Sequence, residues 1–347
     1  ASAYRTAESR KVEDLLRQIP GFDIAGDGRI SFNGKEVDRI LVEGDDLTEK
    51  NYRLLSRNLH AGLVDKVQVM GRYDENRLLA SVSSPEKVGI NLTIDKKYLL
   101  RWSGTVEAGL GTGGQRMTDL NLVRLAPAFK FIQFLQHNTI GLTANADMNH
   151  YFREGEAAGS SSSQEIPVRG LLKAGSILPP PLSASYTRDN DDKSGFSILS
   201  WKSGPAVRMK VLAGGLFTGT SFLSRGWQDI LQPDGYRWQV FFEDASRSDI
   251  QEGVLRYSLQ HDAGKNNLGS YVAELALGRS IHQYANLSSG AITDSLREKL
   301  MTRQVFFHLR GSESFRLPGA AVLNMLFSLR RENPEQGFDA ATGRFRG

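Results

Sequence analysis

The sequence predicts a mainly β protein: a small α/β unit followed by a long antiparallel sheet of the kind that forms a transmembrane β-barrel. Helical periodicity is confined to the first hundred residues, and apolar and polar residues alternate along most of the remaining chain. The alternating segments are about 9 to 14 residues long, whereas strands of globular proteins average about five or six. A tilted strand needs about 9 to 11 residues to cross a bilayer, so the lengths favour a membrane sheet.

A short helix is expected near the N-terminus. Apolar residues recur there at the spacing i, i+3, i+4 and i+7, which places them on one stripe of a helix. Pro20-Gly21 follows directly and is typical of a helix end. The stripe consists of Val12, Leu15, Leu16 and Ile19.

Glycine-bearing turns divide the rest of this unit into short strands. Gly28 lies in a predicted hairpin turn and Gly34 in a second turn, and Glu43-Gly44 ends the apolar run at 40–42. Asp45-Asp46 fits a turn that leads into a helix start, although two acids could also serve a metal or a partner. The expected elements are strands at 22–24, 30–32, 40–42, 64–69 and 90–94 and a helix within 49–59.

From about residue 98, nine or ten segments alternate with a period of two. Two kinds of sheet fit this pattern. In a soluble sandwich the apolar face packs on a second sheet, whereas in an outer-membrane barrel it contacts lipid and the polar face lines a wet lumen. Segment length, aromatic residues near segment ends such as Trp102, and full charges on the polar face favour the barrel.

The connections are expected to be of two kinds. Short turns at 111–114 and 262–265 join neighbouring strands, and longer loops are predicted at 150–169 and 286–297. Short turns on one side and long loops on the other are typical of outer-membrane barrels. The acidic run 189–192 is expected to be a solvated loop, because the spacing of a calcium loop is absent.

Composition excludes several chemistries. The 347 residues contain no cysteine, so thiol catalysis, disulfides and cysteine-ligated metals are excluded. The net charge is only +4 and no long basic block is present, which gives no support for a nucleic-acid partner. The six histidines lack the spacing of a metal site. We therefore expect no metal, no cofactor and no catalytic site.

The first hundred residues resemble the plug domain of TonB-dependent outer-membrane receptors. In that family a helix ends in a hydrophobe-Pro-Gly-hydrophobe turn, as at 12–22 here, and residues 104–111 are similar to the first barrel strand. The plug motif falls on Leu15, Leu16, Ile19, Pro20, Gly21, Gly28, Gly34 and Gly44. Further similar segments are 27–30, 32–37, 40–45, 64–69 and 90–97.

The resemblance implies a plug domain at 1–97 and the N-terminal part of a barrel at 98–347. The family's barrel has 22 strands, so this chain is expected to supply nine or ten of them and to represent the front portion of a longer receptor or a barrel fragment within a complex. It also implies an outer-membrane location and a TonB partner in the periplasm, reached through a segment that precedes this sequence.

The leading hypothesis is a transporter that binds a scarce extracellular solute and admits it when the plug rearranges. The long loops would meet the solute first. Four charged residues on predicted lumen faces are candidates for contact with the solute, with solvated or plug-paired side chains as the alternative. They are Arg208, Lys210, Arg256 and Glu274.

Two other functions remain open on the sequence. A receptor-like barrel without transport activity could be a structural subunit that docks surface lipoproteins or other outer-membrane proteins. A soluble β-rich binding protein is a weaker third possibility. The sequence does not identify the solute.

Overall fold

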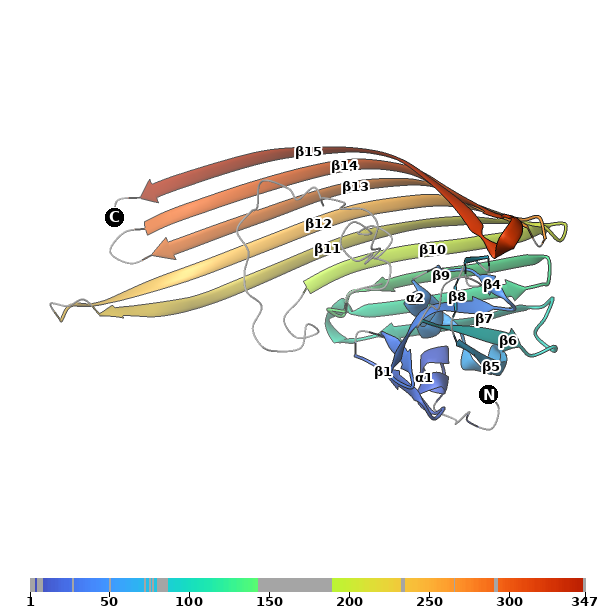
Figure 1. The fold of residues 1–347 in the computed structure, drawn as a ribbon. Helices are drawn as coiled ribbons and strands as arrows, with labels where there is room; N and C mark the ends of the chain where they lie inside the picture. The colour runs from blue at the N-terminus through green and yellow to red at the C-terminus, as the bar shows by residue number, and fades with distance from the viewer. Residues whose placement is uncertain are drawn as a thin grey trace.

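The structure is a computed structural model in which two parts are distinguished, a small α/β unit and a long curved sheet (Figure 1). It describes residues 4, 9–26, 28–49, 51–71, 73–74, 76, 78–79, 87–142, 189–231, 235–264, 266–289 and 293–345. The predicted loop at 150–169 lies outside these residues.

The small unit contains a mixed sheet with the strand order β1-β2-β3-β6-β5, and β4 pairs with β3. Both predicted helices and all five predicted strands are confirmed, and β3 and β6 pair in parallel at its centre. The elements are α1 (Val12–Arg17), β1 (Phe22–Ile24), β2 (Ile30–Phe32), β3 (Lys35–Val42), β4 (Asp45–Asp46), α2 (Tyr52–Asn58), β5 (Val64–Gly71) and β6 (Val88–Ile94).

The helix α1 forms for the reason that the sequence predicts. Val12, Leu15 and Leu16 are fully buried, so one apolar stripe faces the unit's core. The Asp14 carboxylate accepts a hydrogen bond from the backbone N–H of Lys11 at 2.9 Å, which satisfies one free donor at the helix start. The helix ends at Arg17, three residues before Pro20, which belongs to the predicted helix end.

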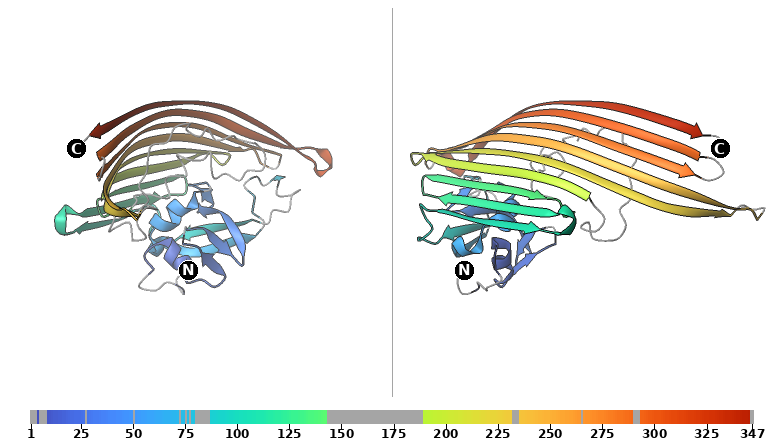
Figure 2. Two further views of the ribbon diagram at one scale, coloured as in Figure 1. Left: turned by 90° about the vertical axis from the view of Figure 1, so that its left-hand side faces the viewer. Right: turned by 180° about the vertical axis from the view of Figure 1, so that it is seen from behind.

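The second part is a single antiparallel sheet in which nine consecutive strands of the described chain pair with their neighbours. Figures 1 and 2 show it as a curved layer whose concave side faces the small unit. Among these strands, β7 and β15 pair on one side only. The strands are β7 (Trp102–Leu110), β8 (Arg116–Leu125), β9 (Phe129–Asn138), β10 (Asp189–Ser203), β11 (Val207–Leu231), β12 (Arg237–Asp262), β13 (Asn267–Ser289), β14 (Thr293–Arg316) and β15 (Val322–Phe345).

The last five strands are longer than predicted. They contain 23 to 26 residues each, about twice the expected length. The predicted loop at 286–297 is therefore wrong, since 286–289 belong to β13 and 293–297 to β14. The predicted loop at 189–192 is also wrong, because these residues begin β10 and Asp192 is fully buried. These polar segments stay extended because their backbones pair with long neighbouring strands, although their sequences show no apolar alternation.

The two faces of the sheet differ in chemistry. On the convex face, large apolar side chains are exposed in successive rows, as at Val106, Leu255 and Leu277. On the concave face at the level of the small unit, Phe134, Phe196 and similar residues are buried. The described apolar residues of the unit and of this wall form one buried cluster. In the part of the chain that the structure covers, no helix has the length and apolarity of a membrane span.

Candidate functional site

An acidic loop of the small unit, residues 43–49, lies between β3 and α2 and faces the concave wall of the sheet. Its turn requires left-handed backbone at Gly44 (φ 73°), which glycine adopts without strain. Glu43 (φ 52°) and Glu49 (φ 55°) are also left-handed, where most residues are disfavoured. The Asp46 carboxylate accepts a hydrogen bond from the Glu49 N–H at 2.7 Å, which fixes the end of the loop.

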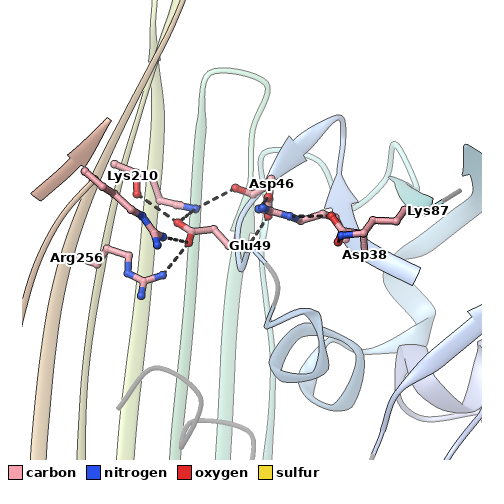
Figure 3. A network of polar contacts seen from close by, with 9 residues as sticks. Asp38, Asp46, Glu49, Lys87, Lys210 and Arg256 are labelled. Carbon is pink, nitrogen blue, oxygen red and sulfur yellow. Dashed lines mark hydrogen bonds and ion pairs between the residues drawn. The ribbon is translucent and has the colours of Figure 1, made fainter. Parts of the chain in front are cut away.

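Glu49 is bound by basic side chains from three strands of the sheet. Its Oε1 lies 3.0 Å from Lys210 Nζ on β11, and its Oε2 lies 2.7 Å from Arg256 Nη1 on β12. Arg310 Nη2 on β14 lies 3.8 Å from the same Oε2. Figure 3 shows the carboxylate between Lys210 and Arg256. One residue of the loop thus joins strands that are distant in sequence.

The basic neighbours determine the charge state of Glu49. Burial alone would raise the pKa of this carboxyl group, because it disfavours the charged form. Lys210, Arg256, Arg39 and Arg310 act in the opposite direction, and their sum leaves the pKa of Glu49 well below its ordinary value. Glu49 is therefore a carboxylate at neutral pH.

Asp45 is the second contact between the loop and the sheet. Its carboxylate pairs with the buried Lys130 of β9, and its Oδ1 lies 3.1 Å from Lys202 Nζ on β10. Arg208 Nη1 on β11 lies 3.4 Å from the same oxygen and donates to the Gly44 carbonyl oxygen at 3.5 Å. Asp45 and Glu49 together contact bases from five strands, β9 to β12 and β14.

Asp46 connects these contacts to the interior of the small unit. Its Oδ2 pairs with Arg39 of β3, and Arg39 Nε lies 3.5 Å from Asp38 Oδ2. Asp38 Oδ1 in turn lies 3.0 Å from Nζ of Lys87, the residue before β6. Figure 3 shows this series running from the sheet wall into the unit. A displacement of the loop would therefore disturb the central strands β3 and β6.

The structure brings all four predicted lumen residues to the concave face. Lys210 and Arg256 bind Glu49, Arg208 binds Asp45, and Glu274 pairs with Arg256. Their contact with a solute stays a prediction. Sequence reasoning named Asp45 only as a turn residue or a possible partner contact, and it missed the acid Glu49 and the basic partners Lys130, Lys202 and Arg310. The alternation within each strand was the available signal, because the basic residues at 202, 208, 210, 256 and 310 each fall on the polar, concave face of their own strand.

Away from the small unit, the described concave face of the sheet has no basic cluster and contains a cavity. A cavity of about 1200 Å³ lies there, lined by Phe222, Ser246, Tyr284 and Glu298 among others. Ser246 precedes Arg256 on β12 by ten residues, or roughly 33 Å of strand. We consider the stretch of the sheet that is level with residues 244–252 of β12. There, the described residues of β10–β15 whose side chains face the concave side include four acids and neither Lys nor Arg. The acids are Asp192, Asp244, Glu252 and Glu298.

Comparison with solved structures finds outer-membrane receptors and transporters. The alcaligin outer-membrane receptor FauA from Bordetella pertussis matches at 11% identity and TM-score 0.27 over 97% of this chain and 57% of its own. The ferric yersiniabactin uptake receptor FyuA from Yersinia pestis matches at 11% identity and TM-score 0.27, over 96% of this chain and 60% of its own. The copper transporter OprC matches at 11% identity and TM-score 0.26, over 97% of this chain and 60% of its own.

The chain thus spans somewhat more than half the length of these proteins. No family model matches the sequence, and no curated protein matches it. The fold itself, a small α/β unit on the concave side of a long antiparallel sheet, is the one that the resemblance to TonB-dependent receptors implies.

Proposed function

We propose that the chain is the plug domain and the first part of the barrel of a TonB-dependent outer-membrane transporter. In this proposal residues 1–97 are the plug and residues 98–347 supply barrel strands. The observation that carries it is the acidic loop, which ties the small unit to the sheet wall through Asp45 and Glu49. A unit held inside a sheet by ion pairs has the arrangement that a gate requires.

The ion pairs suit a gate because water can replace them. When two charged surfaces separate into a wet lumen, hydration offsets much of the lost attraction. The apolar cluster shared by the unit and the wall has no such compensation, so it opposes spontaneous release. Rearrangement therefore needs an applied force, and TonB is the partner that would supply it in this proposal.

The convex face supports a membrane location. Its exposed rows include Leu255, Leu275 and Leu277, whose outward side chains would lie in water if the protein were soluble. Among the described strands β7 and β15 each have one unpaired edge, and lipid offers no hydrogen-bond partner to such an edge. The inserted protein would therefore need further strands to close the barrel.

Solute depletion tests the transport proposal while the solute is still unidentified. A strain that lacks the complete gene, a complemented strain and a complemented strain without TonB are grown in one defined mixture. Mass spectrometry then measures which solutes disappear from the medium. We expect depletion of at least one solute only where both the gene and TonB are present. Uptake that is independent of TonB would reject the proposal.

The alternative function, a structural subunit of an outer-membrane complex, gives a different result. The native protein would then copurify from mild detergent at constant stoichiometry with other outer-membrane proteins, and the three strains would show no difference in solute depletion.

A further inference from the structure

Arg124 is a charged residue in the apolar part of the convex face. It lies near the end of β8, and the strand register places it between Trp102 of β7 and Phe131 of β9 in one row. Within the described residues its guanidinium has no ion pair or hydrogen bond, and its buried Nε lacks a partner. An unpaired charge on a lipid-facing surface is costly unless an anion meets it.

The neighbouring aromatic rings cover one side of this guanidinium. Arg124 Cζ lies 5.4 Å from the centre of the Trp102 ring, within the range of a cation–π contact. The Trp102 and Phe131 rings meet edge to face with centres 5.7 Å apart. The stacking orients the guanidinium but gives its remaining N–H groups no acceptor.

Leu100, which lies next to Arg124 and Trp102, provides a second and independent observation. It has left-handed backbone (φ 68°), and its side chain is 63% exposed. Its N–H donates to the carbonyl oxygen of Leu125, the residue after Arg124, at 2.9 Å. Strained backbone that holds an apolar side chain outward is unfavourable in water. An apolar ligand over Leu100 would account for it.

We propose that Leu100, Trp102, Phe131 and Arg124 form a binding site for a phospholipid of the leaflet nearest the small unit. The phosphate accepts hydrogen bonds from the Arg124 guanidinium, which is suited to phosphate oxygens. The acyl chain lies against Leu100 and Trp102, since aromatic residues are enriched at this depth of a bilayer. The inference rests on the membrane location but not on transport.

Native mass spectrometry of the complete protein in detergent, titrated with phosphatidylglycerol, tests this site. A hydrogen bond from a charged donor is about twice as strong as a neutral one, so Arg124→Gln should weaken lipid binding by about tenfold or more. Arg116→Gln is the matched control, because it removes the same charge from the convex side at the opposite end of β8. Equal binding by wild type and Arg124→Gln, or equal loss in both variants, would overturn the proposal.

Two further measurements distinguish a lipid site from a site for anions alone and from a purely structural role of Leu100. Glycerol phosphate at millimolar concentration should not displace the lipid, because it cannot contact Leu100; displacement would indicate an anion site only. Leu100→Gly should weaken phosphatidylglycerol binding while the thermal midpoint stays equal or rises, because glycine relieves the left-handed strain. A variant that loses stability and keeps its lipid affinity would assign Leu100 a packing role instead.

Discussion

Glu49 combines backbone strain with strong side-chain contacts. Its left-handed backbone costs about 1–2 kcal/mol relative to an ordinary conformation. The hydrogen bond from its N–H to Asp46 and the pairs with Lys210 and Arg256 offset that cost. The left-handed backbone therefore places the carboxylate where the sheet wall can bind it, and these contacts stabilise the loop in this form.

Removing the charge of Glu49 should loosen the contact between the small unit and the sheet wall. In Glu49→Gln, Lys210 and Arg256 lose their shared carboxylate, and breaking a buried pair costs about 3 kcal/mol or more. We expect cells that carry this variant to become sensitive to vancomycin, a large antibiotic that an occluded barrel excludes. Glu13→Gln is the control, because Glu13 pairs with Arg17 and Arg57 inside the small unit. Equal sensitivity in both variants would contradict the role of Glu49.

The pH dependence follows from the lowered pKa of Glu49. A carboxyl group whose pKa is lower in the folded state stabilises that state fully above its unfolded value, about 4.3, and loses this contribution as the pH falls through the folded value. We expect the thermal midpoint of the wild type to stay level from pH 7 to about 5 and to fall only in stronger acid. In Glu49→Gln the acid-dependent fall should be smaller. A decline that begins above pH 6 would assign the effect to other groups.

At the scale of elements, the turns of the small unit differ in how much space surrounds their glycines. Gly28 and Gly44 both have positive φ. A Cβ on Gly44 would meet open space, whereas one on Gly28 would lie 2.7 Å from Arg57 Nη2. Arg57 cannot move away freely, because its Nε binds Glu13 at 3.0 Å.

This difference predicts an order of stability for two alanine variants. Gly44→Ala should lose about 1 kcal/mol, which is the cost of left-handed backbone alone. Gly28→Ala should lose more, about 2 kcal/mol, because the methyl group also displaces Arg57 from Glu13. Thermal unfolding of the two full-length variants measures the order. Equal losses would show that Arg57 adapts without cost.

The elements that the sequence predicted well are those with one buried face. The stripe of α1 and the alternation of β6 show the period directly, because Val12, Leu15 and Leu16 and the apolar residues Ile90, Leu92 and Ile94 are buried in the core. In β5 only Val64 and Val67 contact that core. The outer halves of β13 and β14 carry polar residues on both faces, so no period marks them, and 286–297 looks like a loop. The pairing of Glu49 with Arg256 was also unpredictable, because the fold joins positions 207 residues apart.

At the scale of the whole molecule, the sheet separates an apolar exterior from a charged interior. The outward row that contains Tyr257 and Leu309 carries apolar side chains on β9–β15, while inward positions one residue away carry Lys210 and Arg256. A soluble sandwich would bury the apolar side against a second sheet. Among the described residues that side is exposed, so lipid is the environment that fits it.

A charge placed in the outward apolar rows tests this arrangement. Leu275 lies on β13 between Leu255 of β12 and Phe307 of β14. Leu275→Arg should destabilise the protein folded in lipid vesicles by up to about 2–4 kcal/mol, the cost that an arginine reaches at the bilayer midplane. Gln239→Arg on β12 is the control: Gln239 is exposed on the same side and lies opposite Asp229 of β11, so a new arginine there meets an opposite charge. Its effect should be small. The free energy of unfolding in denaturant measures both variants, and an equal, small effect would mean that lipid does not cover Leu275.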